Sequence, residues 1–412
     1  MIPSAKTNMN ASSMSASSIR SPNDVALSDA LLAHPDVIAA NEHLEELRKR
    51  GHIGVRRRLL ATSVRLSRAM AKDVHRTVDE CVERLELAIP LELYVYSSPQ
   101  FNAACFNPEE GRLFVMLSSS LLESFKDREL CFVMGHELGH HVYGHHDIPI
   151  GFILNGKHAV SPRLALDLFA WSRYAEISAD RTGAYCTGDL SAVALALFRL
   201  ASGLSTEVID FSLDEFLAQV DDMQPTDADA GQGPPREDWF STHPFSPLRV
   251  KALKAFHESA LMQRNGISSA DLEMRVQATM SLMEPSYLEG RSPVAETMRR
   301  LLFSGAIAVA NADGEITDKE VEVFEKFFGG GSFRADLDIA RITADLASRI
   351  EQANLKTSVP HRMQVLRDMC LIARAEGRVE DSARAVLEKI ARDLDIRGPF
   401  VEQCLCGALD PD

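Results

Sequence analysis

The sequence has no long apolar run and no excess of basic residues, and each absence excludes a class of protein. A membrane-spanning helix needs about 20 consecutive apolar residues, whereas the best candidate window, residues 148–154, is far shorter. The 44 Lys and Arg residues are outnumbered by 59 Asp and Glu residues, which gives a net charge of −15. Because affinity for a phosphate backbone depends on clustered positive charge, we expect neither a membrane span nor a nucleic-acid partner.

The seven cysteines are scattered, odd in number and never spaced as Cys-x-x-Cys. A disulfide framework or a cysteine zinc site is therefore not expected, and a reducing, cytoplasmic location is the simplest interpretation. The first 23 residues are rich in Ser, Asn and Met and lack the apolar stretch of a secretory signal. A transit peptide is one interpretation of this leader, but we expect a disordered tail over residues 1–35.

What is present is the composition of a globular protein, with 45% hydrophobic and 25% charged residues. Apolar residues at three- and four-residue steps predict helices from about residue 36 to 87. Aromatic and branched residues predict strands at 91–96 and 112–117. Pro162, preceded by the capping residue Ser161, is expected to open a long helix that runs through Thr187. The sequence therefore predicts an α+β, mostly α fold with a small sheet.

The chain is long enough for two or three domains. We expect a first domain over residues 36–285 and a second over residues 294–412. The second contains a weak internal repeat, because the sequence at 312–318 recurs at 375–381. An apolar helix before and after each copy predicts an all-α pair of helical hairpins. The first copy also fits part of a calcium-binding EF-hand loop, but Val309 stands where the first ligand is needed, so helix capping is preferred.

The strongest motif is His136-Glu137-Leu138-Gly139-His140. Residues four apart lie on one face of a helix, so the imidazoles of His136 and His140 can reach one zinc ion. Glu137 lies between them, where its carboxylate can contact a water on the metal rather than the metal itself. Gly139 lets a neighbouring backbone come close to this helix.

Two residues compete for the third ligand of a catalytic zinc. His146 follows His136 by ten positions, as in the metzincin motif, but Tyr143 occupies the place where that motif has glycine. Glu176 forms an i,i+4 acidic pair with Asp180 on an otherwise apolar helix. This pair is typical of a ligand and of an acceptor for an imidazole N–H, so Glu176 is favoured.

Three further histidines follow the motif: His141, His145 and His146. The simplest interpretation is a polar helix end, where imidazole interacts favourably with the helix dipole. Alternatively, one of them closes a structural zinc site as a fourth protein ligand.

Four motifs occur in order along the chain: Asn102-Ala103, the motif from His136 to His140, Glu176-x-x-x-Asp180 and Ser241-Thr242-His243-Pro244. In this order they resemble the zinc metallopeptidases that include the CaaX prenyl protease, heat-shock HtpX and the Oma-type enzymes, the gluzincins of peptidase family forty-eight. The resemblance covers about residues 55–260 and implies a zincin-like fold. Many of those enzymes embed the site among membrane helices, which this sequence does not predict.

The resemblance also implies a role for each site residue. It assigns one Zn²⁺ per chain to three ligands, His136, His140 and Glu176. Glu137 would be the general base, and Asp180 would hold the imidazole of a ligand. Asn102 and His243 would line the cleft and stabilise the developing oxyanion.

The C-terminal repeat resembles the tellurite-resistance TerB-like helical fold. The segments that resemble it are Asp313-Gly314-Glu315-Ile316 and Glu376-Gly377-Arg378-Val379. This resemblance implies an accessory domain that recruits a protein partner or regulates access to the active site.

The first hypothesis is therefore a soluble zinc endopeptidase that hydrolyses protein or peptide substrates by metal-activated water, with the strand at 112–117 pairing edge to edge with an extended substrate. The alternative is a non-catalytic, zinc-stabilised interaction or regulatory protein that acts through its C-terminal helical domain. A third possibility is a latent peptidase whose cleft is covered by the acidic loop at 221–238 or by the C-terminal domain.

Overall fold

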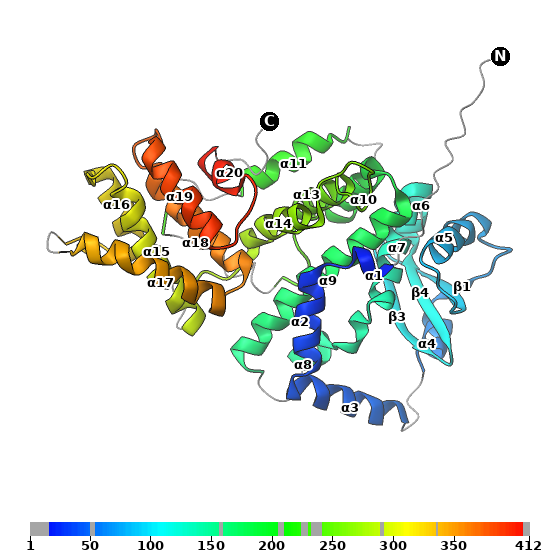
Figure 1. The fold of residues 1–412 in the computed structure, drawn as a ribbon. Coiled ribbons are helices and arrows are strands. Elements are labelled where there is room, and N and C mark those ends of the chain that lie inside the picture. Colours follow the sequence, from blue (N-terminus) through cyan, green and yellow to red (C-terminus); the bar gives the residue numbers. More distant parts are fainter. Residues whose placement is uncertain are drawn as a thin grey trace, which may run out of the picture. The chain divides into compact units, whose positions relative to one another are not determined.

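The structure, a computed structural model, divides the chain into two compact units, residues 1–211 and 212–412 (Figure 1). The residues that it describes are 16–49, 54–155, 160–204, 210–223, 230–231, 241–288, 292–334 and 337–406. Helices predominate, and a four-stranded mixed sheet lies in the first unit. The expected α+β, mostly α class is confirmed.

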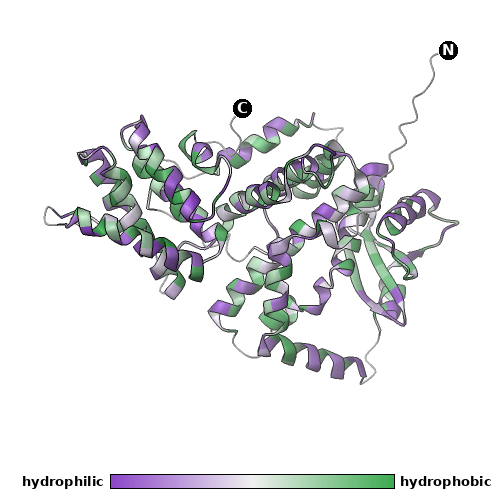
Figure 2. Ribbon diagram, in the orientation of Figure 1, coloured by the Kyte–Doolittle hydropathy of each residue, from purple (hydrophilic) through white to green (hydrophobic). Residues whose placement is uncertain are grey.

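The sheet has the strand order β1-β2-β4-β3. Its strands are β1 (Val64–Leu66), β2 (Leu91–Tyr96), β3 (Ala103–Glu109) and β4 (Arg112–Ser118). The β2–β4 pair is parallel and the other two pairs are antiparallel. Apolar residues follow the strands, as Figure 2 shows. Strand β1 lies between helices α4 (Val55–Thr62) and α5 (Lys72–Arg84), and so interrupts the stretch that the apolar spacing predicted as helical.

Strand β4 lies inside the sheet. It pairs with β2 on one side and with β3 on the other, and its residues Leu113, Phe114 and Val115 are fully buried. The expectation that the strand at 112–117 pairs with a substrate is wrong, because both of its backbone edges already bond to neighbouring strands. Among the described residues, β3 is an edge strand of this sheet.

The first unit also contains several other helices. They are α3 (Pro35–Lys49), α6 (Ser119–Ser124), α7 (Asp127–Val142), α8 (Ile150–Leu154), α9 (Pro162–Thr187) and α10 (Leu190–Ser202), with a short 3₁₀ helix η1 (His145–Asp147). Of these, α6 and α7 contact the sheet. Helix α9 begins as the sequence predicts, since the Ser161 hydroxyl accepts a hydrogen bond from the Leu164 amide at 3.1 Å. It ends at Gly188, whose φ of 67° is the left-handed conformation that glycine adopts at helix ends.

Helices α7 and α9 pack at backbone distance. A Cβ atom added to Gly135 would lie 2.9 Å from the Gly183 Cα, and one added to Gly139 would lie 3.1 Å from the Ala179 Cα. These separations leave no room for a larger side chain at either glycine. The expectation that Gly139 admits a neighbouring backbone is confirmed, and the neighbour is α9.

The N-terminal segment corrects the sequence analysis. Residues 1–15 lie outside the described residues, but α1 (Ala16–Ile19) and α2 (Pro22–Leu32) are ordered helices where a disordered tail was expected. Ile19 is 1% exposed and Asp24 is fully buried. The Ser21 amide donates to the Ser178 hydroxyl of α9 at 3.1 Å. A Ser-rich local composition carries no information about such distant contacts, so the prediction was wrong for residues 16–35.

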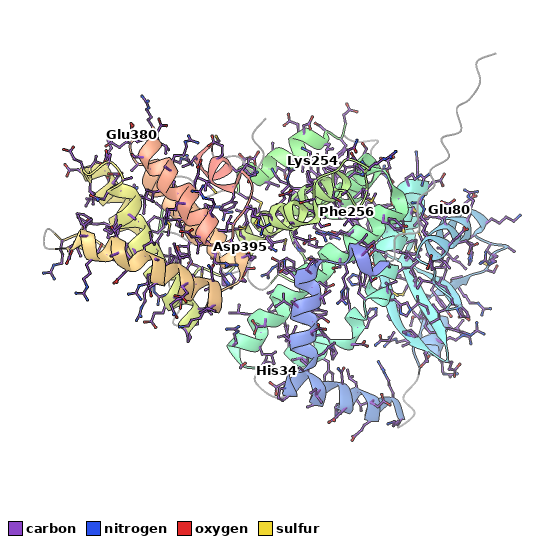
Figure 3. The ribbon with its side chains drawn as sticks, viewed as in Figure 1. His34, Glu80, Lys254, Phe256, Glu380 and Asp395 are labelled. Carbon is purple, nitrogen blue, oxygen red and sulfur yellow. The ribbon has the colours of Figure 1, made fainter. Side chains whose placement is uncertain are left out.

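The described elements of the second unit are helical. They are α11 (Leu213–Asp221), α13 (Ser246–His257), α14 (Ser269–Met280), η3 (Ser281–Met283), α15 (Pro293–Ala310), α16 (Asp318–Phe328), α17 (Ile339–Lys356), α18 (Val359–Ala373), α19 (Asp381–Asp393) and α20 (Phe400–Cys406). Phe256 on α13 is fully buried, whereas Glu380 before α19 is exposed (Figure 3). One apolar cluster includes Leu248 and Met283 as well as Leu302 and Leu366. Residues on both sides of 284–293 thus share a core, while the domain extents 36–285 and 294–412 stay a prediction.

Each copy of the sequence repeat forms the turn between two helices. The first joins α15 to α16 and the second joins α18 to α19, and Gly314 and Gly377 have φ values of 97° and 79°. In the first copy, Thr317 and Glu320 form a reciprocal capping box at the start of α16. This geometry confirms helix capping over an EF-hand loop, because the Glu320 carboxylate caps its own helix.

Candidate metal centre

Helix α7 is buried on most of its surface, and one side of it is an apolar stripe. Its residues Leu130, Met134 and Leu138 are at most 6% exposed. Residues four apart share a helix face, so anchoring this stripe directs His136 and His140 together toward α9. The glycines of the α7–α9 contact lie beside these histidines and let α9 approach closely enough to present Glu176.

Three side chains converge between these two helices. The Nε2 atoms of His136 and His140 are 3.2 Å apart, and the Glu176 carboxylate oxygens lie 3.5 Å and 3.4 Å from them. Two zinc bonds of tetrahedral geometry separate their ligand atoms by roughly 3.3–3.4 Å. The spacing of these donor atoms therefore fits a tetrahedral zinc ion.

The second ring nitrogen of His136 is held by Asp180. Its Nδ1 lies 2.9 Å from the Asp180 Oδ1, and Asp180 is fully buried. Because a carboxylate accepts this hydrogen bond, Nδ1 has the proton and Nε2 presents its lone pair to the cluster. The Asp180 carboxylate thus lies at the second ring nitrogen of His136, and its role in holding a metal ligand stays a prediction.

The surroundings of the cluster are negatively charged. Burial lowers the pKa of His140, but the carboxylates of Glu176, Glu137 and Asp180 outweigh it, and the pKa is raised. Lone pairs that face one another at this separation repel unless a positive charge lies between them. Both the donor set and the local field therefore favour a bound cation.

Glu137 is held beside the cluster by the sheet. Its Oε2 accepts a hydrogen bond of 2.8 Å from the backbone amide of Cys105 on β3. This contact fixes the carboxylate next to the ligands and places the edge strand at the same site. The sequence motif predicts the location of Glu137, but nothing in the sequence identifies the Cys105 amide as its partner.

The structure does not bring Asn102 into hydrogen-bond contact with the cluster. This residue is exposed, and its side-chain amide donates to the Tyr96 hydroxyl at 3.1 Å. It precedes Cys105 by three residues, roughly 10 Å along an extended strand. His243 belongs to the second unit, where its Nδ1 lies 2.9 Å from the Thr242 hydroxyl. Its approach to the metal site stays a prediction.

A cavity of about 320 Å³ adjoins the ligands. His140 and Glu176 line it together with Asn107 and His146, and its apolar lining is Ile148, Pro149, Ile150, Phe152, Trp171 and Ala175. Burial, followed by repulsion from neighbouring histidines, lowers the pKa of His146 to about 4, so its ring is neutral near pH 7. Among the described residues, the structure groups Glu176 rather than His146 with the two motif histidines.

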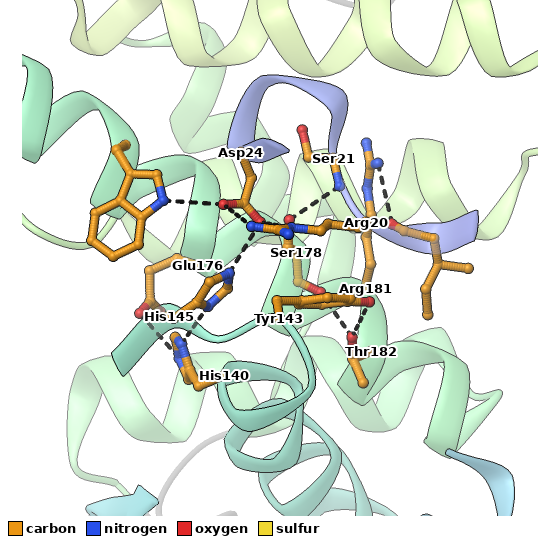
Figure 4. Close-up of polar contacts among 12 residues, drawn as sticks. Arg20, Ser21, Asp24, His140, Tyr143, His145, Glu176, Ser178, Arg181 and Thr182 are labelled. Carbon is orange, nitrogen blue, oxygen red and sulfur yellow. Dashed lines mark hydrogen bonds and ion pairs between the residues drawn. The ribbon is translucent and has the colours of Figure 1, made fainter. Parts of the chain in front are cut away.

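His145 is not part of a polar helix end. It is 5% exposed, its Nδ1 lies 2.8 Å from the His140 Nδ1, and its Nε2 lies 3.0 Å from the Asp24 Oδ2 (Figure 4). The chain reverses after α7 at Gly144, whose φ of 66° lets η1 fold back toward His140. Gly144 was the available sequence signal for this reversal, whereas no signal pointed to Asp24.

Comparison with known proteins agrees with this geometry. Residues 68–257, somewhat less than half of the chain, are similar to Peptidase family M48. A relative from Arabidopsis thaliana, plastoglobule-localized metallopeptidase 48 of the chloroplast, is 30% identical over 171 residues. That alignment covers 39% of this chain and 49% of the relative, so the chain matches about half of the relative's length. No solved structure matches significantly. Across the described residues, we find no helix with the length and apolarity to cross a bilayer.

Proposed function

We propose that this protein is a zinc-dependent endopeptidase. The observation that supports this most strongly is the convergence of His136, His140 and Glu176 within 4.8 Å, with the Glu137 carboxylate held beside them. When bound, zinc supplies a water of lowered pKa and polarises a peptide carbonyl. Glu137 accepts a proton from the attacking water and then delivers it to the leaving amine.

Strand β3 is the element that we propose for binding the substrate backbone. One of its edges pairs with β4, and its Cys105 amide bonds to Glu137, so the strand borders the reacting groups. An extended peptide can add to an exposed strand by backbone hydrogen bonds, which select little sequence. Selectivity would come from the adjoining cavity, whose lining favours an apolar side chain.

The finer features expected from the sequence remain part of the proposal. They are a zincin-like fold around the metal centre, oxyanion roles for Asn102 and His243, a TerB-like domain over 294–412 that recruits a partner, and a cytoplasmic location. The proposed covering loop at 221–238 lies largely outside the described residues. A latent enzyme is tested by removing residues after about 290, because release from inhibition would raise peptidase activity.

Substitution of Glu137 by Gln tests the mechanism. The amide keeps the size of the side chain but cannot accept the proton, so cleavage of a peptide library should fall by about 10²–10⁴-fold while zinc content, measured by mass spectrometry, stays the same. Glu123→Gln, an exposed position on α6, is the matched control and should cleave normally. An active Glu137→Gln protein would refute the general-base role.

The alternative of a non-catalytic zinc protein predicts a closed site with a fourth protein ligand. The cavity beside His140 and Glu176 supports the peptidase instead, since it leaves room for a substrate next to the ligands. A zinc-binding hydroxamate distinguishes the two. It binds an open catalytic site, and its failure to bind the zinc-loaded protein would favour the structural role.

A further inference from the structure

The two motif histidines differ in what holds their second ring nitrogen. The Nδ1 of His136 meets a carboxylate directly, whereas the Nδ1 of His140 meets another ring nitrogen, that of His145, at 2.8 Å. In a hydrogen bond between two imidazoles, one nitrogen must donate and the other must accept. The direction of this bond therefore decides which nitrogen of His140 is available to a metal.

The contact of the other ring nitrogen of His145 determines which imidazole donates. Its Nε2 lies 3.0 Å from the Oδ2 of Asp24, a fully buried carboxylate on α2. Asp24 also accepts hydrogen bonds from Arg20 at 2.8 and 3.1 Å and from the Trp171 indole at 3.1 Å. Burial alone would raise the pKa of Asp24, but His145 and Arg20 hold it well below its usual range.

The positions of the ring protons on His145 and His140 then follow from the ionised state of Asp24. An ionised Asp24 only accepts, so the Nε2 of His145 has the ring proton and its Nδ1 has a lone pair. That lone pair accepts from the Nδ1–H of His140, which leaves the Nε2 of His140 unprotonated toward the cluster. This is the tautomer that metal ligation through Nε2 requires.

From this geometry we infer that Asp24 and His145 form a relay that sets the tautomer and ring orientation of His140. The inference rests on the proposed metal site and adds helix α2 to it as a positioning element. His140 thus receives the support that Asp180 gives His136, but from a carboxylate 121 positions away from His145 in the sequence. Figure 4 shows the continuous series of contacts from Asp24 through His145 and His140 to Glu176.

Independent contacts keep the segment of α1 and α2 in place. The Tyr143 hydroxyl donates to the carbonyl of Ala16 at 2.9 Å, and the Ser21 amide donates to Ser178 at 3.1 Å. Neither contact involves a proposed metal ligand. Removal of the Asp24 carboxylate alone should therefore weaken the relay without releasing the segment.

The first experiment measures zinc affinity of the full chain by competition with a colorimetric chelator. Asp24→Asn should weaken zinc binding by roughly 10–100-fold, the range found when an outer partner of a histidine ligand is lost. Asp29→Asn, at an exposed position on the same helix, is the matched control and should bind as wild type does. Equal affinity of the Asp24→Asn and wild-type proteins would overturn the inference.

A pair of substitutions at His145 separates positioning from packing. His145→Phe removes both ring nitrogens, whereas His145→Asn keeps an acceptor near the position of Nδ1. Zinc affinity should fall more for His145→Phe than for His145→Asn. A relay predicts this partial rescue, while equal losses in the two variants would reduce His145 to a packing residue and contradict it.

The third measurement does not depend on any variant folding. Long-range ¹⁵N–¹H NMR spectra of histidine side chains in the zinc-loaded wild type should show His145 protonated at Nε2 and His140 protonated at Nδ1. His145 protonated at Nδ1 would overturn the inference. None of these readouts uses substrate, so the relay can fail while the result for Glu137→Gln stands. A wild-type protein that binds no zinc would instead refute the proposed function itself.

Discussion

Two regions of the first unit support the same proposed metal site by different physical means. At the contact between α7 and α9, Gly135, Gly139 and Gly183 let two backbones approach, and this sets the distance from the histidines to Glu176. At the contact of α2, a buried Asp24 accepts several hydrogen bonds and orients a ring. Packing thus sets how far the ligands lie from each other, and buried charge sets which ring nitrogen each ligand presents.

Substitution of Glu176 by Ala should have the largest effect, because it removes a ligand rather than the partner of one. Zinc affinity should fall by more than the roughly 100-fold upper range for outer partners. Asp167→Ala, a partly exposed carboxylate on the same helix, is the control and should bind zinc normally. Unchanged zinc content in Glu176→Ala would show that α9 supplies no ligand. The contact between α7 and α9 would then not set the distances between the ligands.

Substitution of Gly183 by Ala tests the backbone contact. The added Cβ would lie 2.5 Å from the Phe132 carbonyl oxygen, so the helices must separate. We expect the free energy of unfolding to fall by about 1–3 kcal/mol, together with a weaker zinc affinity. Gly151→Ala on α8 is the control, since its Cβ would meet no atom within 4 Å. A stable variant with normal zinc affinity would show that close approach is not needed.

The dependence of the unfolding free energy on pH tests the contact of α2, and we expect this effect to be the smallest. A carboxyl whose folded pKa is depressed stabilises the fold above its usual pKa and loses this contribution as the pH falls below it. The ordinary pKa of Asp24 is 3.8. The difference in unfolding free energy between zinc-free wild type and Asp24→Asn, measured with denaturant, should therefore be larger at pH 7 than at pH 3. A difference independent of pH would mean that Asp24 is not ionised in the fold.

Local signals in the sequence predicted much of the contact between α7 and α9. The pair Ser161 and Pro162 defined the start of α9, and helical spacing predicted that His136 and His140 share a face. Glu176 and Asp180 stood out because acids are rare on an apolar helix. These inferences succeed because each depends on residues within a few positions of one another.

The contact of α2 with the site was not predictable, because it joins distant parts of the chain. The segment around Asp24 has the composition of a tail, and its burial becomes evident only when α9 supplies Ser178 and Trp171 as partners. The interior position of β4 escaped prediction for the same reason. Its parallel pairing with β2 places β3 at the edge, and the order of strands along the chain does not reveal this arrangement.

The docking of α2 has a practical consequence for anyone who trims the protein to its recognisable domain. A fragment cut to residues 68–257 would retain all three proposed metal ligands. It would nevertheless lack Asp24, and the imidazole of His145 would face solvent where its anionic partner had been. Weak metal loading of such a fragment would reflect the cut, and would say little about the intact protein.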